Sequence, residues 1–293
     1  MLMRPFGRTG VEVSALGFGA GHIGSPRMAE EHADRLLNAV LDAGINLIDT
    51  ARGYGLSEGR VGRALSHRRA EFVLSTKVGY DVPGEVDWTR AAVRLGIDRA
   101  LDRLGTDLID VCFLHSCDLP VLLAGDVIAE LHAAQAAGKV RVCGYSGEGS
   151  ALRWAIESGA FGAIQTSVNL ADQGSMVNLL PDAHARGLGV IAKRPVANAA
   201  WRFADRPVGD YAEPYWERLS QMGLEPADGD WVGSALRFSA FAPGVSSAIV
   251  GTASLANLAT AVDRIGAGPL PRAEQARWAE AFAPHRDRWP GQV

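Results

Sequence analysis

Short apolar runs alternate with amphipathic segments along almost the whole chain, and this alternation limits the fold more than any other feature. Each run is short and nearly continuous, as expected of strands that are buried on both faces of a parallel sheet. The eight runs are LGFGA (16–20), INLIDT (45–50), FVLSTK (72–77), LIDVCFLHS (108–116), VRVCGYSG (140–147), AIQTSVN (163–169), GVIAKRP (189–195) and SAIVGT (247–252).

The segments between these runs carry helical signals. Residues 33–41 place apolar side chains three and four positions apart and stop at Gly44, and a second helix is predicted from Asp87, as its N-cap, to Gly105. Eight strand–helix repeats predict an α/β fold, a (β/α)₈ TIM barrel. A doubly wound open sheet is the alternative, but the glycines at 17–21 do not have the GxGxxG spacing typical of that fold.

The chain length and the segments outside the strand–helix repeat predict the rest of the architecture. The 293 residues are close to the usual ~250 of one barrel, so a single domain is expected over residues 1–293. Residues 4–15 are expected to form an N-terminal β-hairpin that closes the barrel bottom. Residues 196–230 form a long insert, interpreted either as a cover over substrate or as a packed structural excursion. The C-terminal tail, residues 271–293, is predicted to be helical through Trp289.

Charge and cysteine content argue against several classes of function. The net charge of −4 disfavours a nucleic-acid or anionic-membrane surface, since either needs a basic excess. No apolar run approaches the ~20 residues of a membrane span, and the N-terminus has no apolar signal segment. Cys112, Cys117 and Cys143 form no CxxC pair, which favours a reducing, cytoplasmic location. No cluster has metal-ligand spacing, so no metal is expected.

Polar side chains stand at the ends of most of the predicted strands. A single polar residue there is usually a solvated strand end, whereas ionisable groups ending four different strands are expected to meet at one mouth of the barrel. The ionisable ones are Asp49, Lys77, His115 and Lys193-Arg194. The full set of polar strand ends is Asp49-Thr50, Lys77, His115-Ser116, Ser146, Asn169, Lys193-Arg194 and Thr252.

Four of the residues in this region suit carbonyl chemistry. A ketone that accepts a hydride needs a proton on its developing alkoxide, and Tyr54 can supply one, a contribution of roughly 10²–10⁴-fold. The ammonium of Lys77 would stabilise the phenolate, and Asp49 would hold the charge on Lys77. A neutral His115 could direct the carbonyl oxygen by a hydrogen bond. The plainer alternative is that Asp49 and Lys77 form a structural ion pair.

Several segments together resemble the aldo-keto reductase superfamily. DTARGYGLSE (49–58) is similar to its Asp-to-Tyr signature, LSTKVG (74–79) to its lysine strand and DVCFLHS (110–116) to its histidine strand. The similarity extends over the whole chain, in order. The other segments that carry it are FGRTGVEVSALGFGAGHIG (6–24), GYSGEG (144–149), QTSVN (165–169) and IVGTASLANL (249–258).

The resemblance implies an NAD(P)H-dependent oxidoreductase that reduces aldehydes and ketones by direct hydride transfer. It implies that Tyr54 is the general acid, that Lys77 and Asp49 tune it and that His115 orients the carbonyl. His22 is expected to line the substrate pocket for a small carbonyl compound, while protein partners stay open. The implied cofactor contacts are Gly21, Ser146, Gln165, Lys193, Arg194, Gly251, Thr252 and Asn257.

NADP(H) is the expected cofactor, with NAD(H) as the alternative. The stretch at 251–257 carries no basic residue, so Lys193 or Arg194 would have to supply positive charge, assisted by hydrogen-bond donors such as Asn257 and by the start of the helix near Ser254. A modest preference is therefore expected rather than strict exclusion.

The sequence departs from the family pattern in two places. Many members have Asn where Gly147 stands, and many have an aromatic residue that stacks on the nicotinamide where this chain reads AKRP at 192–195. Either Arg194 or the 196–230 insert could support the ring instead. Glu148 is interpreted either as the cap of the following helix or as a cofactor contact.

Two other functions remain open at this level. One is a non-turnover cofactor-binding subunit, which similarity to potassium-channel β-subunits would imply. The other is a Schiff-base lyase that uses Lys77, which would require a neutral amine. A neighbouring Asp49 would oppose that requirement, because a carboxylate favours the protonated lysine.

Overall fold

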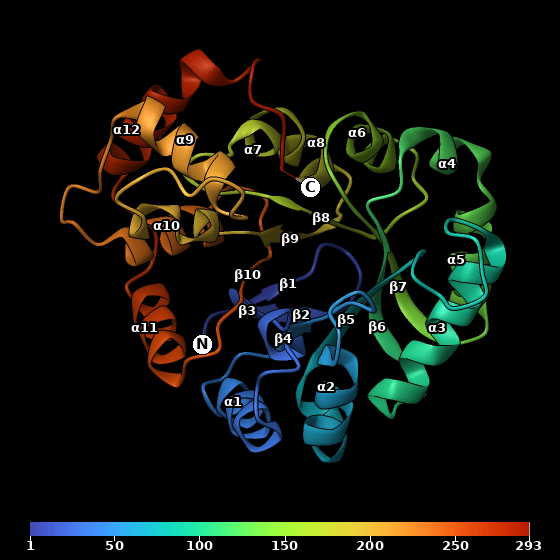
Figure 1. The fold of residues 1–293 in the computed structure, drawn as a ribbon. Helices are drawn as coiled ribbons and strands as arrows, with labels where there is room; N and C mark the ends of the chain where they lie inside the picture. The colour runs from blue at the N-terminus through green and yellow to red at the C-terminus, as the bar shows by residue number, and fades with distance from the viewer. Residues whose placement is uncertain (293) are drawn as a thin grey trace.

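The computed structural model, which describes residues 1–292, contains a closed barrel of eight parallel strands (Figure 1). The strands follow one another in chain order around the barrel, and the last pairs with both the first and the seventh. The predicted (β/α)₈ fold is therefore confirmed. The barrel strands are β3 (Leu16–Gly19), β4 (Leu47–Asp49), β5 (Val73–Val78), β6 (Ile109–His115), β7 (Val140–Ser146), β8 (Ala163–Ser167), β9 (Gly189–Lys193) and β10 (Ser247–Val250).

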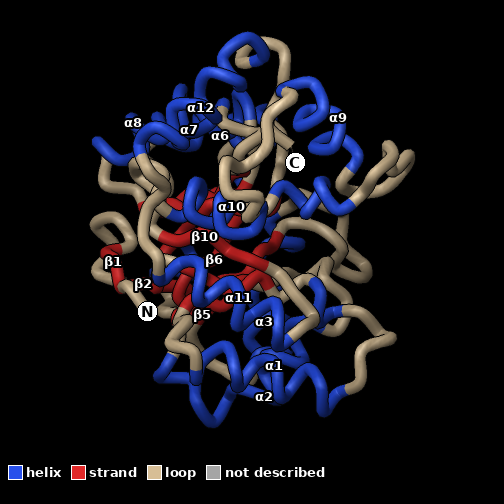
Figure 2. Tube along the Cα trace, turned by 90° about the vertical axis from the view of Figure 1, so that its left-hand side faces the viewer, coloured by secondary structure: helices blue, strands red, loops and turns tan. Residues whose placement is uncertain are grey.

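Helices surround this barrel, and Figure 2 shows the strands gathered in the middle with helices above and below them. The α-helices are α1 (Glu30–Asp42), α2 (Ser57–Leu65), α3 (Arg90–Leu104), α4 (Leu119–Ala124), α5 (Asp126–Ala136), α6 (Gly149–Glu157), α7 (Gly174–Asn178), α8 (Leu180–Ala185), α9 (Glu213–Met222), α10 (Trp231–Ala240), α11 (Leu255–Gly266) and α12 (Arg272–Phe282). Short 3₁₀ segments are η1 (His22–Gly24), η2 (Ser66–Glu71), η3 (Ala197–Arg202) and η4 (Ala283–His285).

The predicted start of α3 is wrong by a few residues. Its N-cap is Thr89, whose hydroxyl accepts the amide N–H of Ala92 at 3.2 Å. Asp87 instead accepts the amide N–H of Asp81 at 3.0 Å and ties the preceding loop together. Both residue types cap helices well, so only the tertiary path of the loop decides which one does so. The predicted end at Gly105 is confirmed by its left-handed conformation.

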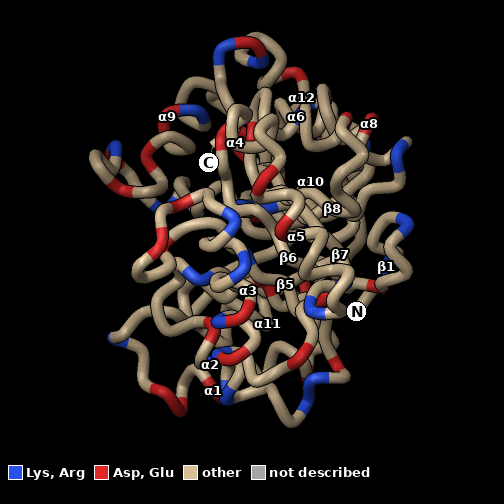
Figure 3. The backbone as a smooth tube through the Cα atoms, turned by 90° about the vertical axis from the view of Figure 1, so that its right-hand side faces the viewer, with Lys and Arg blue, Asp and Glu red and all other residues tan. Residues whose placement is uncertain are grey.

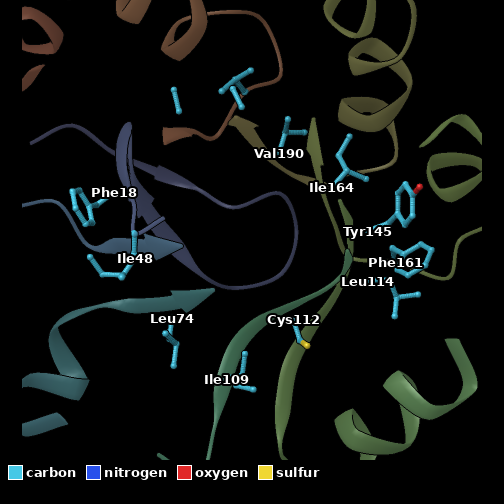
Figure 4. Close-up of a cluster of buried hydrophobic side chains, with 14 of the residues drawn as sticks. Phe18, Ile48, Leu74, Ile109, Cys112, Leu114, Tyr145, Phe161, Ile164 and Val190 are labelled. Carbon is cyan, nitrogen blue, oxygen red and sulfur yellow. The ribbon is translucent and has the colours of Figure 1, made fainter. Parts of the chain in front are cut away.

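Side chains along each strand alternate between two apolar cores, because successive strand residues point to opposite faces. Outward-facing residues such as Ile48, Leu74 and Leu114 pack with the helices, and Figure 4 shows them spreading from the strands away from the barrel centre. Inward-facing residues such as Leu47 and Val111 form a separate core inside the barrel. The barrel is thus filled at its lower end, which leaves its upper mouth for other residues.

An N-terminal hairpin closes the bottom of the barrel, as predicted. Strands β1 (Met3–Pro5) and β2 (Glu12–Ser14) pair antiparallel. Phe6, Val11 and Val13 from this hairpin are buried in the inner core together with the inward-facing strand residues. A plug of this kind leaves the opposite, C-terminal mouth as the open end.

The insert after β9 and the C-terminal tail build a second apolar cluster on one side of the barrel. Fully buried Tyr215 of α9 and Trp278 of α12 belong to it, and Figure 1 shows both helices in the upper left part of the molecule. The prediction of helix through Trp289 is wrong, because the regular helix ends at Phe282 and a 3₁₀ turn follows. Pro284, which lacks an amide N–H, lies in that turn.

Charged residues of both signs are interspersed over the face drawn in Figure 3. Within residues 1–292 no helix combines the length and apolarity needed to cross a membrane. The same described residues contain no group of three or more His, Cys, Asp and Glu side chains placed to hold a metal ion. The three cysteines are buried and not joined by disulfides.

Candidate active site

The strand alternation that fills the barrel also aims the polar strand ends at its mouth. Asp49, Lys77, His115 and Gln165 each lie two or four residues beyond an apolar residue of the inner core on the same strand. Because side chains alternate with period two, these groups point inward as well. Four strands distant in sequence therefore deliver polar groups to one place.

A buried ion pair lies at the base of this mouth. Lys77 Nζ donates to Asp49 Oδ2 at 2.6 Å and to the Thr50 carbonyl at 2.8 Å, and both charged side chains are 2% exposed. The second carboxylate oxygen accepts the hydroxyl of Ser75 at 2.8 Å. Burial alone would lower the pKa of Lys77, but attraction from Asp49 and then from Tyr54 outweighs it and the pKa is raised. A protonated Lys77 argues against the Schiff-base alternative.

Tyr54 lies directly above this pair. The ammonium nitrogen of Lys77 is 4.9 Å from the centre of the Tyr54 ring. The Tyr54 amide N–H donates a hydrogen bond to the Ala51 carbonyl at 3.1 Å, which holds the loop. His115 meets the same ring edge-on, with the ring centres 6.0 Å apart. The four residues predicted from their spacing are therefore one cluster.

His115 is neutral in this setting. Burial, followed by repulsion from Lys77 and Lys193, lowers its pKa to about 3. A neutral imidazole has one N–H to donate, which is what a carbonyl oxygen requires. Its Nδ1 lies 3.0 Å from the hydroxyl of Tyr80, a residue that the sequence reasoning missed. The one sequence feature that could have indicated Tyr80 as a site residue is its position three residues after Lys77.

Ser146 on β7 and Gln165 on β8 follow His115 on β6 around the barrel. His115 is in register with Ser146, and Ser146 with Gln165. The Ser146 hydroxyl donates to Gln165 Oε1 at 2.9 Å, while Gln165 Nε2 is buried without a hydrogen-bond partner among the described residues. An unsatisfied buried donor is costly. A donor facing the cavity therefore fits the carboxamide of a nicotinamide.

Lys193 and Glu148 form a second buried pair. Their closest atoms are 3.3 Å apart; burial lowers the pKa of Lys193 although Glu148 opposes it. Glu148 also accepts the Ser167 amide and the Thr166 hydroxyl, both at 2.7 Å. It gives α6 no side-chain cap, so the helix-cap interpretation is wrong. The carboxylate instead fastens β8 to the end of β9.

The proposed catalytic residues, Ser146, Gln165 and Lys193 face one cavity of about 1130 Å³ at the C-terminal mouth. Every site residue predicted from the sequence lines it, and much of its outer wall comes from the 196–230 insert, which was interpreted as a possible cover over substrate. The predicted lining residues are Gly21, His22, Asp49, Tyr54, Lys77, His115, Ser146, Gln165, Lys193, Arg194, Gly251, Thr252 and Asn257. Further lining residues are Tyr80 and Thr260, the strand-end residue Ser116, and Asn198, Ala199, Trp201, Arg202, Asp210 and Tyr211 of the insert.

One wall of the cavity follows β10. A Cβ atom on Gly251 would lie 2.7 Å from His22 Nδ1 and 3.0 Å from the Gly19 carbonyl, so only glycine fits there. Beyond it, Ser254 caps α11 by accepting the Asn257 amide at 3.3 Å. His22 thus lies against the stretch expected to hold cofactor as well as at the cavity rim.

The facing wall begins at the end of β9 and is built from strained backbone. Arg194, Ala197, Asn198 and Ala199 all have positive φ, from 44° to 56°, which non-glycine residues rarely adopt. Asn198 donates to the Tyr211 carbonyl at 2.9 Å, and the Arg194 guanidinium lies 4.6 Å from the centre of the Tyr211 ring. The insert therefore both lines the cavity and packs into the second apolar cluster, so its two interpretations are compatible.

Ionisable residues gathered at the C-terminal mouth, beside a cavity of this size, place the molecule among the enzyme barrels. Comparison with known proteins narrows that class. The model of the Aldo/keto reductase family matches residues 15–282. The chain belongs to this family of nicotinamide-dependent oxidoreductases.

Individual relatives agree with this assignment. The chain is 28% identical to L-galactose dehydrogenase of Arabidopsis thaliana over 273 residues, covering 87% of this chain and 85% of the relative. It is 30% identical to D-threo-aldose 1-dehydrogenase of a Pseudomonas species, covering 73% and 77%. Among solved structures, it matches an aldo-keto reductase of Bacillus halodurans in its holo form with a TM-score of 0.85 and 26% identity over 96% of each chain.

Proposed function

We propose that this protein interconverts a small aldehyde or ketone and its alcohol by direct hydride transfer, with Tyr54 as the general acid. The observation that carries this proposal is the single cluster at the base of the cavity, in which half-buried Tyr54 and His115 lie against the buried Lys77–Asp49 pair. General acid catalysis by a positioned side chain contributes roughly 10²–10⁴-fold.

Each residue of the cluster has a distinct task in reduction. The nicotinamide cofactor, when bound, supplies the hydride. Tyr54 gives its hydroxyl proton to the developing alkoxide oxygen, and Lys77 stabilises the phenolate left behind. Asp49 keeps Lys77 protonated at its 2.6 Å contact. Neutral His115 donates one hydrogen bond to the same oxygen and directs it toward Tyr54.

Further residues would hold the cofactor. Gln165 Nε2, a buried donor facing the cavity, and Ser146 suit the carboxamide of the nicotinamide. Packing of Arg194 on Tyr211 supplies a planar surface at the end of β9, where many family members have an aromatic residue. The amide groups at the start of α11, which begins at Leu255, favour a phosphate because a helix N-terminus carries partial positive charge.

We infer a modest preference for NADP(H) over NAD(H). Lys193 is engaged with Glu148, so the exposed Arg202 is better placed than Lys193 for a 2′-phosphate. Asp210 lines the same cavity and would oppose that charge. One charge-assisted contact contributes roughly 1.5–3 kcal/mol, which the nearby carboxylate reduces.

Sugar-like carbonyl compounds are the substrate class to test first. Two relatives carry names of enzymes that act on L-galactose and on D-threo-aldoses. Polar groups on the cavity wall, including His22, Tyr80, Ser116 and Asp210, would suit a hydroxylated substrate, while Trp201 provides an apolar face.

The test is a panel of aldoses, short hydroxyaldehydes and aromatic aldehydes, assayed by consumption of NADPH and of NADH. The proposal expects turnover of at least one class and tighter binding of NADPH, measured by quenching of tryptophan fluorescence. Arg202→Ala should weaken NADPH binding without weakening NADH binding. Tight cofactor binding with no turnover across the panel would favour a non-turnover cofactor-binding subunit instead.

A further inference from the structure

Tyr80 contacts the proposed catalytic residues at His115. It lies on the loop between β5 and α3, lines the cavity, and places its hydroxyl oxygen 3.0 Å from His115 Nδ1. The two rings lie 5.2 Å apart at an angle of 34°, so they overlap partly while the hydroxyl reaches the ring nitrogen. Nothing in the proposed proton transfer uses Tyr80 directly.

The loop around Tyr80 is held tightly. Gly79 has φ of +129°, and a side chain on it would collide with the Trp88 ring. The Trp88 amide donates to the Gly79 carbonyl at 2.7 Å, and the Trp88 ring packs on Tyr80 at 5.6 Å. Arg52 donates to the Asp81 carbonyl. The residues on both sides of Tyr80 in the sequence are therefore fixed by hydrogen bonds, and its ring is packed.

Gly53, on the loop that carries Tyr54, lies next to the Tyr80 hydroxyl. A Cβ atom on Gly53 would lie 3.1 Å from the Tyr80 hydroxyl oxygen, which is closer than nearly all real contacts of that kind. Gly53 has no positive φ, so its lack of a side chain is not needed by the backbone. The residue next to Tyr54 therefore leaves space for the Tyr80 hydroxyl.

We infer that Tyr80 is a positioning residue whose hydroxyl donates to His115 Nδ1, fixing the tautomer in which Nε2 carries the proton and faces the substrate oxygen. In a neutral imidazole one nitrogen donates and the other accepts, and the partner of one nitrogen sets the role of the other. A donor at Nδ1 leaves Nε2–H for the carbonyl. The inference rests on the proposed function in one respect: the carbonyl oxygen that this N–H would bind belongs to the proposed substrate.

The charges around the pair keep both groups neutral. Burial, and then the neighbouring Tyr54, raise the pKa of Tyr80, so its hydroxyl keeps the proton that it donates. The low pKa of His115 keeps Nδ1 available as an acceptor. If the Tyr80 hydroxyl oxygen instead accepted a hydrogen bond from Nδ1–H, Nε2 would be unprotonated and could not donate to a carbonyl.

The first experiment reads the tautomer without any substrate or cofactor. Nitrogen-15 NMR of histidine-labelled protein, with the His115 signals assigned by their loss in His115→Asn, should show an unprotonated Nδ1 that accepts a hydrogen bond and a protonated Nε2. In Tyr80→Phe the Nδ1 signal should move to the position of an acceptor without a partner. A protonated Nδ1 in the wild-type protein, or identical signals in both proteins, would overturn the inference.

The second experiment tests the consequence for catalysis. Tyr80→Phe should lower kcat about two- to tenfold, as expected for the loss of one hydrogen bond, with cofactor affinity unchanged. Gly53→Ala should lower kcat in the same direction by crowding the hydroxyl. Tyr145→Phe is the matched control, because that buried hydroxyl bonds the Cys117 carbonyl at 2.7 Å and lies outside the cavity lining; its kcat should stay at the wild-type value.

The outcomes separate this inference from the proposed function. If the NMR result holds but the wild-type protein turns over no carbonyl compound, the proposed reaction fails and the tautomer assignment survives. An active wild-type protein in which Tyr80→Phe has wild-type kcat and unchanged His115 signals overturns the role of Tyr80 alone. Equal losses of kcat in Tyr80→Phe and Tyr145→Phe would indicate a general structural effect and also overturn it.

Discussion

The two walls of the cavity are built in different ways. On the β4–β6 wall, Asp49, Lys77 and His115 stand at strand ends and are held by short, direct contacts. On the β9–β10 wall, a long insert supplies Asn198 and Tyr211 from strained and exposed backbone. The first wall carries the proposed chemistry, while the second shapes the space around the cofactor and substrate.

This difference shows that the barrel places proton transfer and the selection of substrate and cofactor on different walls. Proton transfer needs groups fixed to within about 0.5 Å, and the strand ends of a closed barrel supply rigid positions for them. Selection of substrate and cofactor tolerates variation, and loops can change length and sequence without disturbing the barrel. Substitutions on the first wall should therefore affect turnover, and those on the second should affect binding and stability.

The largest effect is expected on the β4–β6 wall, at the proposed acid. Tyr54→Phe should reduce carbonyl reduction by at least about two orders of magnitude, because the alkoxide loses its proton donor. Cofactor affinity should stay nearly unchanged. Steady-state kinetics and fluorescence titration measure the two quantities, and near-wild-type turnover would remove Tyr54 from the mechanism.

The next largest effect is expected from breaking the buried Asp49–Lys77 ion pair, which should change both stability and turnover. Lys77→Met should cost about 3–5 kcal/mol of stability, because it leaves the Asp49 carboxylate buried without its partner. It should also abolish most turnover. Urea denaturation and kinetics on the same preparations measure both effects.

The double variant Asp49→Asn/Lys77→Met is the control for this pair. It removes both charges, so much of the stability should return while turnover stays low. A double variant with both stability and activity restored would mean that the pair serves structure alone. A double variant as unstable as Lys77→Met would show that the unpaired carboxylate is not the cause.

A smaller, pH-dependent effect is expected behind the β9–β10 wall. Burial, with a contribution from Glu148, raises the pKa of Asp172 to about 7, while Arg218, Gln292 and Tyr215 oppose the rise. A raised carboxyl pKa stabilises the fold fully below the unfolded value of 3.8 and loses that contribution as the pH rises through about 7. Wild-type stability should therefore fall relative to Asp172→Asn across this window.

The slope of that difference cannot exceed about 1.4 kcal/mol per pH unit for one proton. Urea midpoints of the two proteins at several pH values would measure it. Parallel stability curves for wild type and Asp172→Asn would contradict the assignment.

The smallest effect is expected at the outer edge of the insert. Tyr211→Ala removes the ring on which Arg194 packs at 4.6 Å, a contact worth about 0.5–1 kcal/mol at an exposed position. Cofactor should bind about two- to fivefold more weakly, with kcat unchanged. Tyr211→Phe keeps the ring and should bind as the wild type does. A fall in kcat without weaker binding would assign this residue to the other wall.

Much of the barrel and of the first wall could be predicted because both follow from local repetition. Strand alternation has period two, so an inward apolar residue two or four positions earlier predicts where Asp49, Lys77 and Gln165 point. Helix ends at glycine follow equally local rules, as at Gly105. The closed barrel then brings strand ends from distant parts of the sequence to one mouth.

The rest depended on contacts between segments that no local pattern connects. Whether Thr89 or Asp87 caps α3 depends on the path of the loop. Tyr80 becomes part of the site only because two loops meet above the barrel. Glu148 turns to Lys193 and β8 rather than to its own helix, because a buried ammonium there requires a carboxylate partner.

The sequence by itself thus determined the eight-fold repeat, the inward row of polar strand ends and the four residues proposed to carry the chemistry. Only the tertiary structure decided the outer wall, because its left-handed backbone between 194 and 199 is held by packing and hydrogen bonds from elsewhere, such as the one from Asn169 to the Arg194 carbonyl at 3.1 Å. Local preference opposes that conformation for non-glycine residues, so sequence patterns could not predict it.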